Sequence, residues 1–170
     1  MYLVRRISYG LWASNDGFKS GELPADRIGK ELRTSKNALS LWRASGSERD
    51  SVGPAVDALI FSLSTLVALD VAWIDEAGLT ADGVELDPTP GETKLADSVG
   101  LHVDAVRLDV SRLAVVARSL SVAVASKDRV WRLTEAEVVE RAARVVRDRR
   151  VRVANLPQEW RTRLGPHLDA

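Results

Sequence analysis

The feature that most constrains this sequence is a long apolar stretch, residues 56–74, whose hydrophobic period changes partway along. Its first part repeats apolar residues at the helical intervals i, i+3, i+4 and i+7, namely Val56, Leu59, Ile60 and Leu63. Its second part, residues 66–74, is apolar on both alternate sets of positions except at Asp70, as in a strand covered on both faces. The stretch therefore predicts a helix that starts at Gly53-Pro54, followed by a strand at the centre of a sheet. Its internal charges exclude a membrane span.

Similar patterns predict further elements along the chain. Short runs of β-branched and aromatic residues predict strands at residues 2–8, 38–44 and 101–108. Apolar residues at helical spacing predict helices at residues 24–33, 110–120, 134–148 and 157–164. Asp109 is placed to cap the second of these helices, and Thr134 with Glu137 forms a capping box at the start of the third.

Three segments leave alternatives open. Residues 75–93 are dense in glycine and proline, which predicts a loop with at most a turn of helix or a short edge strand. Long loops of this kind are functional more often than average. Residues 121–133 fit either a hairpin or a continuation of the preceding helix through Val124. Residues 151–153 fit a short strand.

Together these patterns predict one α+β domain over residues 1–170, with a mixed sheet of about four to six strands packed by three or four helices. The chain has no cysteine, which excludes disulfides, thiolate metal sites and cysteine nucleophiles. The N-terminal residues lack the pattern of a secretory signal, so we expect a cytoplasmic protein with no membrane partner. The 19 arginines against 5 lysines point to a bacterium with a GC-rich genome.

Charge is unevenly distributed along this formally neutral chain. Residues 1–47 carry 8 basic and 4 acidic groups, and residues 127–163 carry 11 and 6. Residues 48–110 carry 13 acidic groups against 3 basic ones. If the basic ends meet on one face, they will attract an anionic partner despite the neutral total. The alternative is that folding mixes these charges over the surface.

Most catalytic signatures are missing from the sequence. It contains no glycine-rich loop of the dinucleotide or Walker type and no Gly-x-Ser-x-Gly motif. Its only histidines are His102 and His167, so a zinc site would need carboxylates for most of its ligands. We therefore expect no metal and no cofactor.

His102 and Asp104 form the one candidate catalytic pair. They lie two residues apart on a predicted strand, so their side chains point to the same face. A histidine paired with a carboxylate is suited to general-base catalysis. The alternative is a polar pair on the solvated side of a half-buried strand.

Two groups of residues are candidate anion-binding sites. Arg33, Asn37 and Arg43 bring guanidinium and amide groups to one loop and the strand after it, which suits phosphate or carboxylate. The alternative for this segment is turn chemistry with solvated charges. The helix at residues 134–148 presents Arg141, Arg144 and Arg147, which could contact the phosphates of a nucleic acid. The alternative is that Glu137 and Glu140 neutralise the arginines of the same helix through i, i+4 ion pairs.

These observations support three hypotheses for function. The first is a non-catalytic interaction or accessory domain of a bacterial cytoplasmic system, binding a protein partner through charged surfaces, with Trp12 and Trp160 exposed near the ends for that partner to cover. The second is a small enzyme, such as a nuclease or toxin-like effector, whose arginines hold a phosphate-bearing substrate while His102 and Asp104 move protons. The third is a nucleic-acid-binding module that uses the arginine-rich helix.

Overall fold

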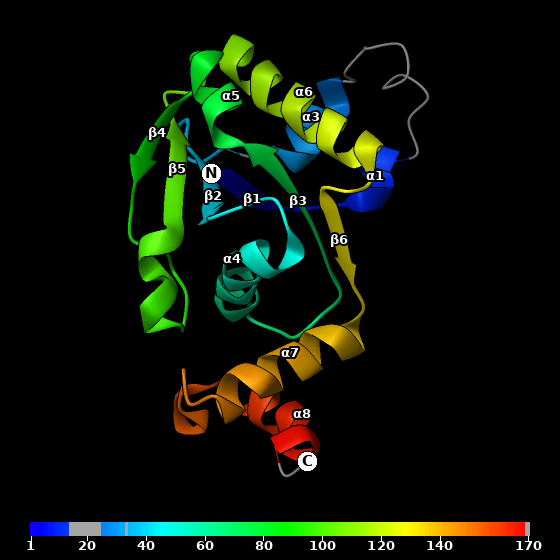
Figure 1. Ribbon diagram of the computed structural model, residues 1–170, viewed down its shortest axis with the longest axis vertical. Coiled ribbons are helices and arrows are strands. Elements are labelled where there is room, and N and C mark those ends of the chain that lie inside the picture. Colours follow the sequence, from blue (N-terminus) through cyan, green and yellow to red (C-terminus); the bar gives the residue numbers. More distant parts are fainter. Residues whose placement is uncertain (14–24, 33, 169–170) are drawn as a thin grey trace.

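A single six-stranded sheet organises the chain, in the strand order β4-β5-β2-β1-β3-β6 (Figure 1). The computed structural model describes residues 1–13, 25–32 and 34–168. Every strand pairing in it is antiparallel. The strands are β1 (Tyr2–Ile7), β2 (Leu39–Ala44), β3 (Leu69–Asp75), β4 (Glu85–Pro88), β5 (His102–Val106) and β6 (Val130–Leu133).

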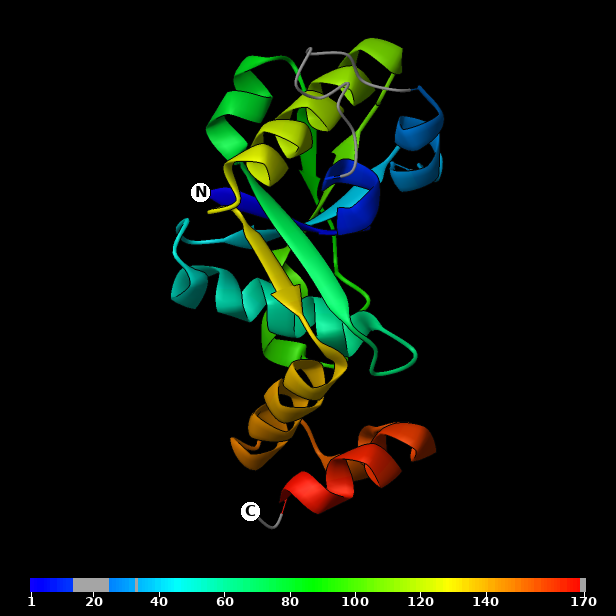
Figure 2. The ribbon, with the colours of Figure 1, turned by 90° about the vertical axis from the view of Figure 1, so that its right-hand side faces the viewer.

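Helices cover both faces of this sheet. They are α1 (Tyr9–Ala13), α3 (Ala25–Glu31), α4 (Arg49–Ser62), α5 (Glu76–Ala81), α6 (Val110–Ser126), α7 (Glu135–Arg147) and α8 (Gln158–Leu168), with 3-10 turns η1 (Ala96–Leu101) and η2 (Val153–Asn155). One face packs against α4, with α7 and α8 beyond it, and the other packs chiefly against α6. Figure 2 shows α7 and α8 next to α4, on the far side from α6.

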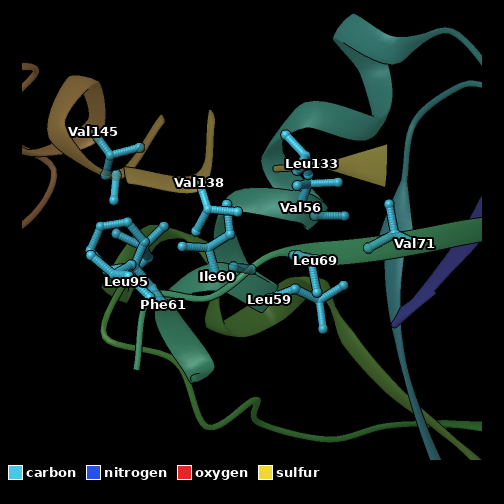
Figure 3. Packing of buried hydrophobic residues seen from close by; sticks show 14 of the residues in the cluster. Val56, Leu59, Ile60, Phe61, Leu69, Val71, Leu95, Leu133, Val138 and Val145 are labelled. Atoms are coloured by element: carbon cyan, nitrogen blue, oxygen red, sulfur yellow. The ribbon is translucent and has the colours of Figure 1, made fainter. Parts of the chain in front are cut away.

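Helix α4 is buried along most of its length because it lies between the sheet and α7. Val138 and Val145 of α7 belong to the same apolar cluster as Ile60 and Phe61 of α4 (Figure 3). Phe61 also makes an edge-to-face contact with Trp160 of α8, with ring centroids 5.2 Å apart. This double coverage explains why the helical part of residues 56–74 is so apolar.

The α+β class is confirmed, and the structure corrects two details of the predicted architecture. All pairings are antiparallel where a mixed sheet was expected. Strand β3 lies between β1 and β6, next to an edge, where the centre of the sheet was expected. It is nevertheless covered on both faces, because Val71 and Trp73 join the α4 cluster while Ala72 and Ile74 join the α6 cluster. Burial on two faces does not require a central place in the sheet.

The open segments are also settled. Residues 75–93 contain both the short helix α5 and the edge strand β4. The hairpin at residues 121–133 is wrong, because α6 continues to Ser126 and ends at Lys127, which has a left-handed φ of 61°. The strand at residues 151–153 is wrong as well, since a 3-10 turn begins at Val153. Helix α4 starts at Arg49 and therefore includes Pro54 in its interior.

Trp12 and Trp160 are not available to a partner. Trp12 is 4% exposed and Trp160 is fully buried, contrary to the prediction that they lie in weakly structured ends. The indole Nε1 of Trp160 donates to the carbonyl oxygen of Ser64 at 2.9 Å, and Lys94 lies over its ring. Both side chains therefore stabilise the fold.

A buried carboxylate joins α4 to α7 and to the segment that follows it. Asp57, 6% exposed, accepts hydrogen bonds from Nε of Arg141 at 2.5 Å and from Nη1 of Arg150 at 3.1 Å. Arg141 also donates to the carbonyl oxygen of Gly53, and Arg150 extends the network to Asp97. Each charge is thus satisfied by more than one partner, as buried ions require.

Replacing Asp57 with alanine should lower the free energy of unfolding by about 3–5 kcal/mol, because Arg141 is then buried without its counter-ion. Urea unfolding followed by circular dichroism measures this change. The control is Glu85→Ala, which removes the partner of Arg107, a side chain that is 76% exposed. That pair is on the surface, so its loss should cost less than about 1 kcal/mol. Equal losses in the two variants would contradict the structural role of Asp57.

Candidate functional site

A pocket of about 700 Å³ opens on the α4 side of the sheet. Three neighbouring strands, β1, β2 and β5, form its floor, and the C-terminal end of α4 forms one wall. The segment between β4 and η1 closes another side. The residues that matter for its chemistry are Arg6, Ser40, Trp42, Thr89, His102 and Asp104.

Strand register brings the polar groups of this pocket together. In the β2–β5 ladder, Ser40 lies opposite Asp104 and Trp42 lies opposite His102. Residues opposite one another in an antiparallel pair share a face, so all four side chains point toward the pocket. The sequence-based prediction that His102 and Asp104 lie on one face is confirmed.

Hydroxyl groups link the histidine to the carboxylate. The Thr89 hydroxyl donates to Oδ2 of Asp104 at 2.9 Å and lies 2.8 Å from Nδ1 of His102. A threonine hydroxyl has one hydrogen, so Thr89 can only accept at its contact with the ring. Nδ1 of the neutral imidazole therefore carries the proton, and Nε2 keeps its lone pair. Ser40 donates to the other carboxylate oxygen, Oδ1 of Asp104, at 3.1 Å.

The imidazole of His102 is held from two further sides. Its ring makes an edge-to-face contact with Trp42, with centroids 5.0 Å apart, and the residue is 9% exposed. Gly91 packs against the ring of Trp42 and the Cβ of His102, so a Cβ there would lie 2.7 Å from Cβ of His102 and 2.9 Å from Cζ3 of Trp42. The backbone of Gly91 is fixed by a hydrogen bond to the carbonyl oxygen of Val99. Only glycine fits at this position without displacing the site.

A half-buried arginine, Arg5, lies at the β1 end of the pocket. Arg5 donates to the carbonyl oxygens of Ser40 and Glu31, at 2.9 and 3.0 Å. Burial lowers the pKa of Arg5 to about 10, and the charge of Glu31 opposes that shift. The guanidinium therefore stays protonated at neutral pH and anchors the backbone beside the pocket.

The predicted anion-binding loop does not join this site. Arg43 lies on the opposite face of the sheet, where two of its nitrogens donate to Glu76 at 3.1 and 2.9 Å. Asn37 is exposed at a turn with φ 60°, and it does not line the pocket. Arg33 lies outside the described residues. Of the residues in the small-enzyme hypothesis that the structure describes, it therefore brings together only His102 and Asp104.

The predicted arginine face of α7 is largely committed to contacts within the chain. Arg141 binds Asp57, and Arg147 donates to Glu140 at 2.7 Å and to the carbonyl oxygen of His167. Arg144 is exposed and has no ion pair among the described residues. The expected i, i+4 pairs with Glu137 and Glu140 do not form, because Arg141 turns inward and Glu137 caps the helix.

Sequence reasoning missed Arg6, Ser40, Thr89 and Gly91. Thr89 and Gly91 lie in the glycine- and proline-rich segment that was singled out as a candidate functional loop. Ser40 could have been found from its alternation with Trp42, had the pairing of β2 with β5 been known. That pairing is set by contacts distant in sequence.

Changing Gly91 to alanine should displace the segment that carries Thr89 and lower the free energy of unfolding by about 1–3 kcal/mol, as overpacking does. Chemical unfolding measures the stability, and the imidazole NMR signals of His102 report the site. Gly100→Ala is the control, since a Cβ there meets no atom within 4 Å. Unchanged His102 signals in the Gly91 variant would show that this glycine does not shape the site.

Within the described residues, no group of three or more histidine, aspartate or glutamate side chains could hold a metal ion. The same part of the chain contains no helix that is both long and apolar enough to cross a bilayer. Comparison with protein families, with characterised proteins and with solved structures gives no match for this chain. Function must therefore be argued from the pocket itself.

Proposed function

We propose that this protein is an acid–base enzyme that acts on a small polar substrate bound in the pocket, with His102 as its proton acceptor. The observation that carries the proposal is the chain of hydrogen bonds from His102 through Thr89 to Asp104. It fixes one tautomer of the imidazole and leaves Nε2 as the free base. A concave site with a few convergent polar groups is where ligands usually bind.

Each residue in this series of hydrogen bonds has a distinct role in the proposal. Nε2 of His102 takes a proton from the substrate or from an attacking water, a step that contributes about 10²–10⁴-fold to a rate. Asp104 stabilises the imidazolium that results, through Thr89 and through its own charge, because Oδ1 lies 3.9 Å from Nε2. Ser40 and Thr89 are positioning residues that hold the carboxylate in place.

The hydrogen bonds favour proton transfer over covalent catalysis. Ser40 donates to Asp104 and not to His102, so the imidazole is not placed to take the proton of Ser40 and activate its oxygen as a nucleophile. The proposal keeps His102 and Asp104 from the second sequence-based hypothesis. It does not use Arg43 or Asn37, which lie away from the pocket.

The test is turnover of a panel of nitrophenyl esters, nitrophenyl phosphates and aminoacyl anilides. Replacing His102 with glutamine should lower the rate by about 10²-fold or more, because the general base is lost. Thr89→Val should lower it less, since the ring remains and only the link to Asp104 is removed. His167→Gln is the matched control, because this histidine lies on α8 and does not line the pocket. Failure of the intact protein to turn over any member of the panel, or full activity of the His102 variant, would refute the proposal.

A second candidate function is supported by three exposed arginines. Arg144, Arg149 and Arg152 lie at the C-terminal end of α7 and just after it, and none has an ion pair among the described residues. We propose that these three arginines serve an accessory role by binding an acidic protein partner. The nucleic-acid hypothesis named Arg141, Arg144 and Arg147, of which only Arg144 belongs to this set.

Replacing these three arginines together with glutamine should weaken binding of poly-glutamate at low salt, as measured by fluorescence anisotropy. A duplex DNA probe distinguishes phosphate binding, whose affinity falls steeply as salt rises. The matched control replaces Arg107, Arg118 and Lys127, which are exposed elsewhere, and removes the same net charge. Equal weakening by both triple variants would show that net charge, and not this cluster, governs binding.

A further inference from the structure

Most charged groups around the pocket are already engaged within the protein. The titratable residues that line it are Arg5, Arg6, Glu31, Glu92, His102 and Asp104. Asp104 accepts from two hydroxyl groups, and His102 is bonded through Nδ1. Arg5 donates to two carbonyl oxygens, and Glu31 accepts from the backbone N–H of Ser8 and from Nε1 of Trp12. These four residues form the fixed frame of the site.

The two remaining charges are opposite in sign, and among the described residues neither has an ion-pair partner. Arg6 lies on β1, on the face that packs toward α4, because it pairs in register with Val71 of the α4 cluster. Glu92 lies on the segment between β4 and η1, directly after Gly91. Both are exposed, and neither forms an ion pair with the other or with any other described residue. As far as the structure describes the chain, the pocket thus presents one cation and one anion without an ion-pair partner, on different elements.

This pattern discriminates among classes of ligand. A purely anionic ligand, such as inorganic phosphate, gains from Arg6 but is repelled by Glu92 and Asp104. A purely cationic ligand gains from Glu92 and Asp104 but is repelled by Arg6. A ligand that carries both charges complements both groups, and electrostatic complementarity of this kind sets specificity more than total affinity.

We propose that the pocket binds an amphoteric ligand of the amino-acid or short-peptide class, with its carboxylate on Arg6 and its ammonium on Glu92. The proposal rests on the function proposed above, whose substrate it specifies. Apolar side chains also line the pocket, among them Ile7, Leu59 and Pro90, which suits a ligand with an apolar side chain. Such a ligand would lie across the face that carries His102.

The experiment compares four kinds of probe for binding to the intact protein by isothermal titration and by NMR of the pocket residues. They are the free amino acids leucine and phenylalanine, their N-acetyl derivatives, their carboxamides, and inorganic phosphate. The free amino acids should bind tightest. Masking either charge should weaken binding about fivefold, the value of one solvent-exposed ion pair.

Two variants test which residue binds the carboxylate of the ligand and which binds its ammonium group. Arg6→Gln should remove the preference for the free amino acid over its carboxamide, and Glu92→Gln should remove the preference over the N-acetyl derivative. Arg118→Gln, an exposed arginine on α6, is the control and should change neither preference. Binding of phosphate or of an N-acetyl derivative as tightly as the free amino acid would overturn the inference, and so would the absence of binding by every probe. Turnover by the His102 variant is measured in a separate experiment. Loss of that turnover therefore still supports the proposed enzyme activity, even where the amino-acid probes do not bind.

Discussion

The site depends on the alternation of side chains across β1, β2 and β5 where these strands leave the cover of α4. Under the helix this face carries Val4 and Trp42, and beyond its last turn the same face carries Arg6, Ser40 and Asp104. The change from apolar to polar coincides with the end of the helix. A shift of one residue in the β2–β5 register would turn Ser40 and Asp104 to opposite faces of the sheet.

Two structural features fix the position at which this face changes from apolar to polar. The network of Asp57, Arg141 and Arg150 fixes α4 against α7, and therefore fixes the point at which α4 stops covering the sheet. Gly91 lets the segment that carries Thr89 approach Trp42 and His102 closely. The first acts through buried charge, and the second acts through the absence of a side chain.

Local patterns in the sequence were enough to predict the helix within residues 56–74, the capping box of Thr134 and Glu137, and the shared face of His102 and Asp104. Each of these depends on residues a few positions apart. Three of the failures concern partners distant in sequence: the place of β3 in the sheet, the pairing of Arg43 with Glu76, and the inward turn of Arg141 toward Asp57. Helical or strand periodicity carries no information about such contacts.

The central claim is that Thr89 accepts a hydrogen bond from Nδ1 of His102 while it donates its own proton to Asp104. Nitrogen-15 NMR of the imidazole at neutral pH tests it most directly, because it reports which ring nitrogen of the neutral histidine is protonated. The structure requires the proton on Nδ1 of His102 in the intact protein, and loss of that constraint when Thr89 becomes valine. A proton found on Nε2 in the intact protein would contradict the account.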